Sequence, residues 1–316
     1  KNKALNLMAD ALLADSAAII DANARDMERG AQDGLPSGLL DRLELNRERI
    51  ASIASALRDL AVLPDPVGEI VRGQTLPNGL KLRQVRVPMG VVGMIYEARP
   101  NVTVDAAGIA LKSGNAVILR GGSAALESNI ALVDTLRAAL GSADLPPDLI
   151  QTIDPLGREG AVALMQARGL VDVLIPRGGA GLIQTVVREA QVPVIETGVG
   201  NCHVYVDGQV DEDQALAIVL NSKTHRDSVC NAAETLLVNR KVASSFLPRV
   251  LAALDERNVV LHADEVAASF APAGVETVEA TDVDWAEEYL SAHMAIGVVD
   301  SVDDAIEHMQ NWSSGH

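Results

Sequence analysis

Aromatic residues, cysteines and cations are scarce in this sequence, and each shortage argues against a class of function. Phe, Trp and Tyr make up only 2% of the 316 residues, so we expect no aromatic platform for stacking single-stranded nucleic acid. The 43 Asp and Glu residues outnumber the 26 Lys and Arg residues, which gives a net charge of −17. Nucleic acid and anionic membranes are therefore poor partners. An anionic substrate would need a local cluster of Arg and Lys side chains.

Long hydrophobic runs and a cysteine framework are also lacking. No apolar run approaches the roughly 20 residues of a membrane-spanning helix, and the first ten residues are amphipathic rather than signal-like. Cys202 and Cys230 are the two cysteines, too few for the disulfide framework of a small secreted protein. The six histidines show no ligand spacing with cysteines or carboxylates, so we expect no metal. These absences favour a soluble, cytoplasmic protein with no membrane partner.

Ala, Leu and Val are abundant, and the chain is long enough for two domains with aliphatic cores. Apolar residues recur at helical spacing over residues 5–19 and 50–60. Pro36 suits the first turn of a further helix. Residues 71–87 indicate a polar hairpin, because the stretch 77–79 contains Asn-Gly, a strong turn signal.

From residue 91 onward, short apolar strands alternate with helices. This alternation predicts an α/β fold in which helices cover both faces of a parallel sheet. Such sheets bind ligands at the carboxyl ends of their strands. The expected strands are residues 91–96, 116–119, 149–153, 171–175 and 192–195, and the expected helices are residues 104–112, 124–140, 158–167 and 181–190.

Two of these strand ends carry the same Arg-Gly-Gly turn before a helix. One is Arg120, Gly121 and Gly122, and the other is Arg177, Gly178 and Gly179. Glycines let a phosphate approach the backbone, free N–H groups point at it, and Arg supplies positive charge. Neither turn is a Walker loop or a G-x-G-x-x-G fingerprint. The alternative is a pair of ordinary glycine-rich turns, but two in one sheet favour a nucleotide site.

Cys230 follows a polar loop that carries Lys223, His225 and Arg226. A thiol beside cations ionises more readily, and the thiolate is the nucleophilic form. Cys230 is therefore a candidate nucleophile. The alternative is a small buried thiol that fills the core, with an ordinary solvated loop beside it.

Several longer stretches match a known family. They are Val87–Asp105, Leu111–Gly122, Ile175–Gly179, Gly198–Asp207 and Ser228–Thr235. On these stretches the chain resembles the gamma-glutamyl phosphate reductases, or glutamate-5-semialdehyde dehydrogenases, of the aldehyde dehydrogenase superfamily. The most specific part is Tyr96–Val104, where general aldehyde dehydrogenases carry an aromatic-Asn-Phe-Pro sequence. The resemblance covers essentially the whole chain.

The resemblance implies an aldehyde dehydrogenase-like α/β fold with two domains and a small oligomerisation hairpin. A parallel-sheet NADP-binding domain would cover residues 1–70 and 88–206, and an α/β catalytic domain would cover residues 207–316. The hairpin, residues 71–87, would pair with another subunit, so a homo-oligomer is expected. The family pattern continues with a C-terminal segment beyond residue 316.

The reaction implied by the resemblance is reduction of L-glutamate 5-phosphate by NADPH to glutamate 5-semialdehyde and phosphate, the second step of proline biosynthesis. Cys230 would displace the phosphate and form a thioester, which the hydride then reduces. The backbone N–H of Cys230 and the side chain of Asn101 would stabilise the oxyanion, although a turn-capping Asn is the alternative. Functional coupling to the kinase that makes glutamyl phosphate is also expected.

The same resemblance implies residues for the charged groups of the substrate. The cations would be Arg99, Lys223, His225 and Arg226, with Arg226 preferred to Lys223 because Arg binds phosphate bidentately. Glu97 would hold Arg99 or the substrate ammonium.

The resemblance also implies how the cofactor is bound. NAD-using aldehyde dehydrogenases commonly carry a Glu three residues after the basic residue that ends the second strand; these positions are here Ser123 and Arg120. A carboxylate would repel a 2′-phosphate, whereas Ser123 beside Arg120 would accept one, which favours NADPH. A plain helix N-cap is the alternative for Ser123. Glu288 matches the Glu that holds the nicotinamide ribose, with an exposed acidic residue as the alternative. Glu196 matches a hydrolytic general base and is expected to be dispensable for reduction.

Two other functions share parts of these patterns. A coenzyme A-acylating aldehyde dehydrogenase would share Cys230 and the sheet, but the Tyr96–Val104 stretch argues against it. A non-enzymatic nucleotide-binding protein would carry an inert core thiol, and the polar approach to Cys230 argues against that.

Overall fold

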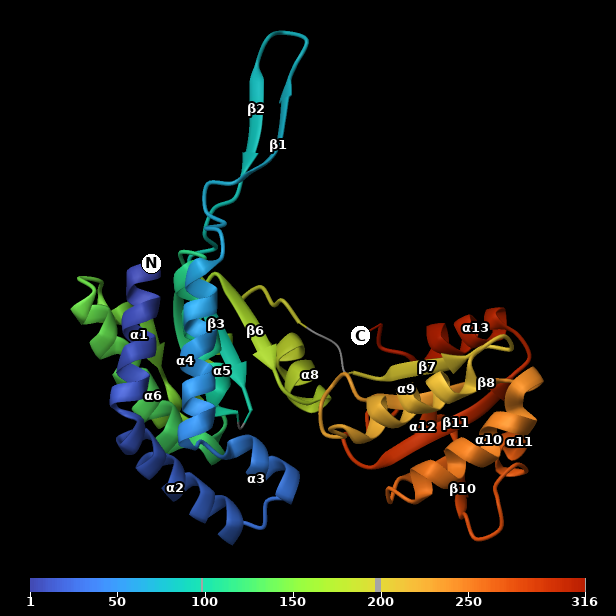
Figure 1. Ribbon diagram of the computed structural model, residues 1–316. Helices are drawn as coiled ribbons and strands as arrows, with labels where there is room; N and C mark the ends of the chain where they lie inside the picture. Colours follow the sequence, from blue (N-terminus) through green and yellow to red (C-terminus); the bar gives the residue numbers. More distant parts are fainter. Residues whose placement is uncertain (98, 197–199, 316) are drawn as a thin grey trace. The chain divides into compact units, whose positions relative to one another are not determined.

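A computed structural model describes residues 1–97, 99–196 and 200–315. The chain folds into two compact units, Lys1–Thr197 and Gly198–His316. Each unit is built on its own parallel sheet covered by helices (Figure 1). The α/β architecture expected from the alternating strands and helices is confirmed.

The sheet of the first unit has the strand order β5-β4-β3-β6, and all its pairs are parallel. The chain runs from β3 through β4 to β5 on one side, and then places β6 on the other side of β3. The topological switch point therefore lies between β3 and β6, where open α/β sheets bind their ligands. The strands are β3 (Val91–Tyr96), β4 (Ala116–Arg120), β5 (Ile150–Thr152) and β6 (Val173–Arg177).

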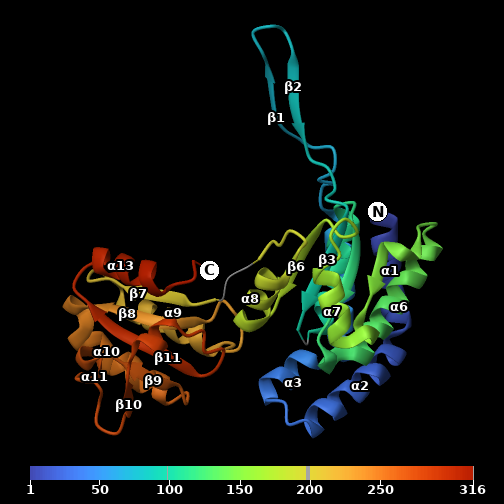
Figure 2. The same cartoon turned by 180° about the vertical axis from the view of Figure 1, so that it is seen from behind.

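Helices pack on both faces of this sheet and give the unit two apolar cores. Residues of α1, α4, α5 and α6 share one core with β3 and β4, whereas residues of α7 and α8 pack on the opposite face (Figure 2). The helices are α1 (Asn2–Ala14), α2 (Ser16–Gln32), α3 (Ser37–Leu43), α4 (Arg47–Val62), α5 (Pro100–Lys112), α6 (Leu126–Ser142), α7 (Gly157–Met165) and α8 (Ala180–Glu189), with 3₁₀ turns η1 (Ser123–Ala125), η2 (Pro147–Leu149) and η3 (Asp154–Leu156).

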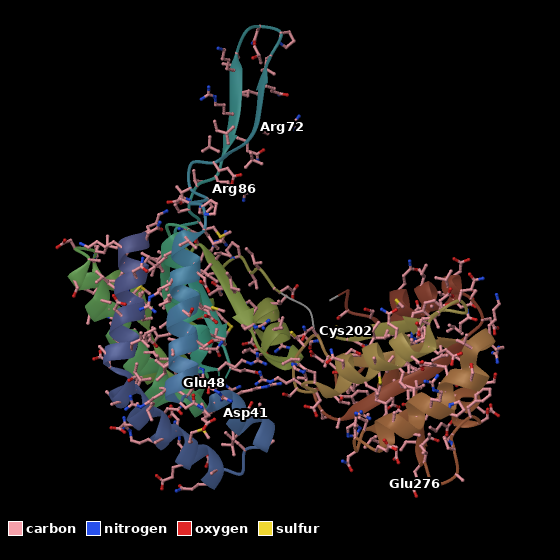
Figure 3. The ribbon with its side chains drawn as sticks, in the orientation of Figure 1. Asp41, Glu48, Arg72, Arg86, Cys202 and Glu276 are labelled. Carbon is pink, nitrogen blue, oxygen red and sulfur yellow. The ribbon has the colours of Figure 1, made fainter. Side chains whose placement is uncertain are left out.

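The expected hairpin is confirmed as β1 (Ile70–Thr75) paired antiparallel with β2 (Lys81–Val85). Gly79 has a φ of 85°, a conformation that glycine adopts without a steric penalty. Every residue of both strands is exposed, and Arg72 and Arg86 extend from the hairpin and its base (Figure 3). The hairpin therefore buries no apolar face within the first unit.

The second unit has a parallel sheet in the order β10-β9-β11-β8-β7. Its core joins β8 and β11 to α9 and α10. The strands are β7 (Cys202–Val206), β8 (Ala233–Asn239), β9 (Val260–Ala263), β10 (Thr277–Glu279) and β11 (His293–Val299), and the helices are α9 (Glu212–Thr224), α10 (Arg240–Asp255), α11 (Glu265–Ala268), α12 (Asp282–Ala286) and α13 (Val302–Trp312).

Two expectations about the chain path need correction. The first domain was expected to end at Val206, but β7 pairs with β8 and so belongs to the second unit. The strand expected over residues 192–195 is wrong, because only Val194 forms an isolated bridge, with Leu174. Pro193 has no N–H group and so removes one ladder donor there. One family-matching stretch begins at residues 198–199, which lie outside the described residues.

Candidate functional site

The Arg-Gly-Gly turn after β4 is hydrogen-bonded to the buried carboxylate of Asp154. The Gly121 N–H donates to Asp154 Oδ1 at 2.6 Å, and Asn129 Nδ2 donates to Asp154 Oδ2 at 2.9 Å. A Cβ at position 121 would lie 2.1 Å from Asn129 Nδ2, so a larger residue there would displace the Asn129 side chain. Burial raises the pKa of Asp154, and these hydrogen bonds oppose the rise.

A buried chain of hydrogen bonds ties this turn to the end of β3. The Tyr96 hydroxyl lies 2.7 Å from Thr103 Oγ1, which donates to Asn129 Oδ1 at 2.9 Å. Burial raises the pKa of the Tyr96 hydroxyl. The sequence analysis missed Thr103 and Asn129. Their polarity on the buried faces of α5 and α6 was the available signal.

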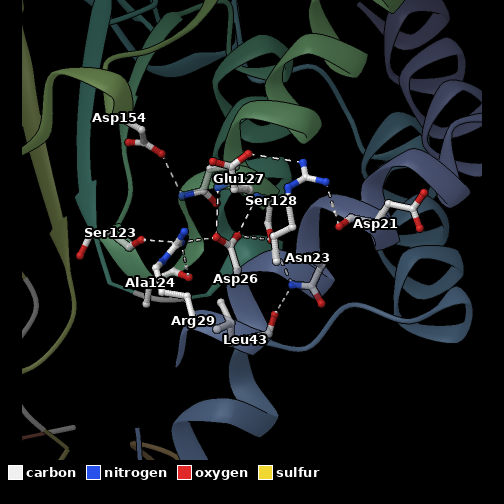
Figure 4. Close-up of polar contacts among 12 residues, drawn as sticks. Asp21, Asn23, Asp26, Arg29, Leu43, Ser123, Ala124, Glu127, Ser128 and Asp154 are labelled. Carbon is white, nitrogen blue, oxygen red and sulfur yellow. Dashed lines mark hydrogen bonds and ion pairs between the residues drawn. The ribbon is translucent and has the colours of Figure 1, made fainter. Parts of the chain in front are cut away.

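The N-terminus of α6 is already filled by a carboxylate from α2. The fully buried Asp26 side chain accepts hydrogen bonds from Ser128 N at 2.8 Å and Ser128 Oγ at 2.6 Å, and from Glu127 N at 3.2 Å (Figure 4). The Glu127 and Ser128 N–H groups of this helix end are therefore not free for a phosphate. Ser123 is exposed and begins η1 rather than capping α6. Its side chain remains available to a ligand.

The second Arg-Gly-Gly turn lies at the topological switch point and contacts Glu97. The Gly179 N–H donates to Glu97 Oε2 at 3.1 Å, and the Glu97 N–H donates to the Arg177 carbonyl at 3.2 Å. A Cβ at Gly178 would lie 2.6 Å from Glu97 Cδ. The Glu97 carboxylate thus lies where helix α8 would otherwise present an N–H group to an anion. The expected pairing of Glu97 with a substrate ammonium stays a prediction.

Three of the expected site residues line one cavity of about 650 Å³ in the first unit, namely Arg99, Asn101 and Arg177. Asn101 lies in the first turn of α5, one residue after Pro100, so it does not cap a turn. Its Nδ2 donates to Asp105 Oδ2 at 3.2 Å. Burial raises the pKa of the Asp105 carboxyl, against the effect of this hydrogen bond.

Arg120, the basic residue that ends β4, is suited to hold an anionic ligand. Its Nε is buried and makes no hydrogen bond to any residue that the structure describes. A buried N–H group without an acceptor is unfavourable, so a ligand that supplies one would be stabilised. With the exposed Ser123 three residues later, the turn fits the phosphate of a nucleotide cofactor.

The second unit holds Cys230 in the turn between α9 and β8. Its thiol is free and partly exposed. A Cβ at Gly200 would lie 1.9 Å from the Cys230 carbonyl oxygen, and Cys202 Sγ donates to the same oxygen at 3.4 Å. Cys202, labelled in Figure 3, therefore anchors the turn that carries Cys230.

Lys223 is not available to a substrate, contrary to expectation. Its side chain is fully buried, and its Nζ donates to the equally buried Glu234 Oε2 at 2.5 Å. Burial raises the pKa of Glu234 to about 7, although Lys223 and the Leu290 N–H lower it. His225 and Arg226, by contrast, are exposed. They remain the candidate cations of this loop.

Glu288 lies close to Cys202, the residue that anchors the turn carrying Cys230. Its negative charge raises the pKa of both the Cys202 thiol and the Glu234 carboxyl, after the larger effect of burial on each. The neighbouring residue, Tyr289, holds this part of the chain in place, because its hydroxyl donates to Asp284 Oδ1 at 3.0 Å. Glu288 is partly exposed, and its role in binding the nicotinamide ribose stays a prediction.

Within residues 1–97, 99–196 and 200–315, no helix has both the length and the hydropathy to cross a membrane. No group of three or more His, Cys, Asp or Glu side chains in the described part of the chain has the geometry of a metal site. Glu196 is exposed at the end of the first unit.

Comparison with known proteins defines the class. The model of the aldehyde dehydrogenase family matches residues 43–304, and the chain belongs to this family of oxidoreductases, which use a nicotinamide cofactor. Over its full length the chain is 60% identical to the gamma-glutamyl phosphate reductase of Kineococcus radiotolerans and 57% identical to that of Thermobifida fusca, covering 73% and 75% of those proteins.

A solved structure agrees with these relatives. The crystal structure of gamma-glutamyl phosphate reductase from Thermotoga maritima matches the whole chain with a TM-score of 0.92 at 42% identity, and the match covers 75% of that protein. The resemblance inferred from the sequence is thereby confirmed. The chain spans about three quarters of the length of these relatives.

Proposed function

We propose that the chain reduces L-glutamate 5-phosphate with NADPH to L-glutamate 5-semialdehyde and phosphate, the second step of proline biosynthesis. The observation that carries this proposal is Cys230, a free and partly exposed thiol in a turn whose backbone Gly200 and Cys202 hold in place. The names of the relatives supply the substrate, an acyl phosphate of glutamate.

In the proposed mechanism, the Cys230 thiolate attacks the acyl carbon. A C–S bond forms, the C–O bond to phosphate breaks, and phosphate leaves with the electron pair, so that the product is a thioester. The backbone N–H of Cys230 and the amide of Asn101 donate hydrogen bonds to the oxyanion. NADPH, when bound, would supply the hydride that reduces the thioester carbon. The thiohemiacetal on Cys230 then collapses to the aldehyde and returns the thiolate.

The phosphate and the carboxylate of the substrate need cations, and the structure leaves three of the four that the sequence analysis named. Arg99, His225 and Arg226 are proposed to bind the phosphate and the carboxylate. Lys223 is excluded from this set by its buried pairing with Glu234.

NADPH is proposed as the cofactor because the turn after β4 offers two groups for a 2′-phosphate. Arg120 has a buried Nε without an acceptor among the described residues, and Ser123 is exposed. Glu288 is proposed to bind the nicotinamide ribose. The Gly179 N–H at the start of helix α8 donates to Glu97. A cofactor pyrophosphate bound there would replace Glu97 as the acceptor of this hydrogen bond.

The reverse reaction tests the proposal. Purified chain is given glutamate 5-semialdehyde, NADP and phosphate, and NADPH formation is followed by absorbance. We expect NADPH formation only when phosphate is present, its loss in Cys230→Ser, and its retention in the matched carboxylate variant Glu196→Gln. Reduction of NADP without phosphate, or only with coenzyme A, would overturn the acyl phosphate mechanism.

The exposed hairpin supports the further proposal that the protein is a homo-oligomer. Both strands of a two-stranded sheet are edges, and their unpaired N–H and C=O groups favour pairing with another strand. An isolated hairpin is also marginally stable in water. Coupling to the kinase that makes the acyl phosphate stays a prediction.

A further inference from the structure

Helix α2 reaches the turn that carries Arg120 and Ser123, although about a hundred residues separate them in the chain (Figure 4). Asp26 holds this contact by filling the N-terminus of α6. Because the Asp26 carboxylate already accepts from the Glu127 and Ser128 N–H groups, these two donors are not open to a second anion. Side-chain cations would then strengthen the binding of a phosphate at this turn.

Arg29, one helical turn after Asp26, supplies such a cation. It forms an ion pair with Asp26, and its Nη2 donates to the carbonyl oxygens of Ser123 at 3.1 Å and Ala124 at 3.4 Å. All of these contacts use Nη2. The Nη1 and Nε groups donate to no residue that the structure describes, and the side chain is 39% exposed. A guanidinium carries five N–H donors, so most of them remain for a ligand.

Two independent observations concern the turn that carries Ser123. From one side Arg29 contacts its carbonyl oxygen, and three residues earlier in the chain Arg120 has a buried Nε that lacks an acceptor among the described residues. Two arginines and an exposed hydroxyl make a site for a phosphate monoester dianion. In a chain with a net charge of −17, such a local cluster is what an anionic group requires.

We infer that Arg29 is a specificity-determining residue that binds the 2′-phosphate of NADPH together with Arg120 and Ser123. This inference rests on the proposed NADPH-dependent function. Arg29 lies in the N-terminal helical region, far in sequence from the turn, so no pattern around Arg120 identifies it. Its direct contact with the Ser123 carbonyl distinguishes it from the other arginine of α2, Arg25, which pairs with Glu127.

Calorimetric binding of 2′,5′-ADP and 5′-AMP to the full chain tests this role, since the two probes differ only in the 2′-phosphate. We expect Arg29→Gln to weaken 2′,5′-ADP binding by about tenfold or more and to leave 5′-AMP binding unchanged. Arg29→Lys should recover part of the loss. The matched control is Arg25→Gln, which removes an exposed cation from the same helix and should change neither constant.

Each outcome separates the inference from the proposed function. If the unmodified chain prefers 2′,5′-ADP and Arg29→Gln keeps that preference, Arg29 only anchors α2, and the inference is overturned while NADPH use stands. Equal weakening of both probes also overturns it, because the effect is then structural. If the unmodified chain binds both probes equally, the NADPH proposal itself fails. Inorganic phosphate as a third probe should compete with 2′,5′-ADP and not with 5′-AMP.

Discussion

A glycine beside the candidate nucleophile shows how one missing side chain positions another residue. Gly200 packs directly on the backbone of Cys230, and the Cys202 thiol donates to the same carbonyl oxygen. The turn is therefore located by contacts to its backbone, and the thiol remains free to react. The backbone of Cys230 thus fixes where the residue lies, whereas its thiol carries out the proposed reaction.

We predict that Gly200→Ala abolishes most of the reductase activity. The new Cβ would lie 1.9 Å from the Cys230 carbonyl oxygen, and backbone atoms yield less readily than the end of a side chain. A shift of about 1 Å at a reacting group lowers a rate by about a hundredfold. Steady-state kcat and the rate of thiol alkylation by iodoacetamide measure the effect.

Gly208→Ala is the matched control, because its Cβ would lie nearest to two side-chain atoms rather than to backbone, Lys241 Cδ at 3.1 Å and Asn239 Oδ1 at 3.2 Å. It should keep nearly full activity and an unchanged alkylation rate. Equal behaviour of the two variants would show that the Gly200 contact does not position Cys230.

At the scale of elements, a buried ion pair joins α9 to β8 on either side of the Cys230 turn. Lys223 and Glu234 are both fully buried, and Glu234 Oε1 also accepts from the Leu290 N–H at 3.3 Å. The pair therefore connects three segments of the second unit. Because Lys223 is buried in this pair, it is not available to bind the substrate phosphate, as the sequence had led us to expect.

We predict that Lys223→Met lowers the free energy of unfolding by about 3–5 kcal/mol, because it leaves Glu234 buried without its partner. Urea unfolding followed by circular dichroism measures this loss. The double variant Lys223→Met with Glu234→Gln removes both charges and keeps an acceptor for Leu290, so it should recover most of the stability. A double variant as unstable as the single one would show that the loss arises from packing.

Helix α13 carries a histidine whose environment opposes protonation. Burial, helped by nearby His203, lowers the pKa of His308 to about 4. Its ring meets Trp285 edge-on with 4.9 Å between centroids and lies 6.5 Å from Trp312. These are the two tryptophans of the chain, so tryptophan fluorescence reports on this cluster.

We predict that acid loosens α13 from the second unit. A histidine with a lowered pKa in the folded state contributes stability that is present above the ordinary value near 6.5 and is lost as pH falls toward about 4. The loss is less than about 3 kcal/mol, because the ring is partly exposed. Tryptophan emission and urea stability between pH 7 and 4 measure it, and His308→Gln should flatten this dependence. An unchanged profile in the variant would assign the acid response to other groups.

The elements of the first unit could largely be predicted because their signals are local. Apolar periodicity identified β3 and most helices of the first unit, and the Asn-Gly signal identified the hairpin. Helix α5 begins at Pro100, earlier than expected, since a proline is well placed in a first turn. The strand over 192–195 failed because an apolar run cannot show whether a neighbouring strand pairs with it.

The candidate site could be predicted only where a residue sits in a local pattern. Cys230 and Arg120 were proposed in this way, and Ser123 was proposed from the family resemblance. Asp26 and Arg29 were not, because they reach the site through contacts with residues about a hundred positions away. A charged side chain in a polar loop also looks the same in sequence whether it is solvated or buried against a partner, which is why Lys223 was misassigned.

At the scale of the whole molecule, the two units divide the proposed chemistry between them. The first holds the residues proposed to bind the phosphates of NADPH, and the second holds Cys230 and Glu288, the residue proposed to bind the nicotinamide ribose. The hairpin contributes to neither, since every residue of its strands is exposed. A solvated pair of edge strands that serves no site within its own chain is best explained as a surface for another copy.

We predict that the hairpin drives self-association. Replacing residues 71–84 with a short Gly-Ser turn removes the edges and should convert the oligomer to a monomer in sedimentation velocity, with the circular dichroism of the two sheets retained. The point variant Leu82→Lys should act in the same direction, because the residue is 43% exposed on β2 and a lysine there discourages pairing. Its matched control is Leu170→Lys, which charges a residue that is 78% exposed elsewhere on the first unit and should leave the sedimentation unchanged. Identical sedimentation of the intact chain and the hairpin replacement would contradict the prediction, and an effect of Leu170→Lys as large as that of Leu82→Lys would place the contact outside the hairpin.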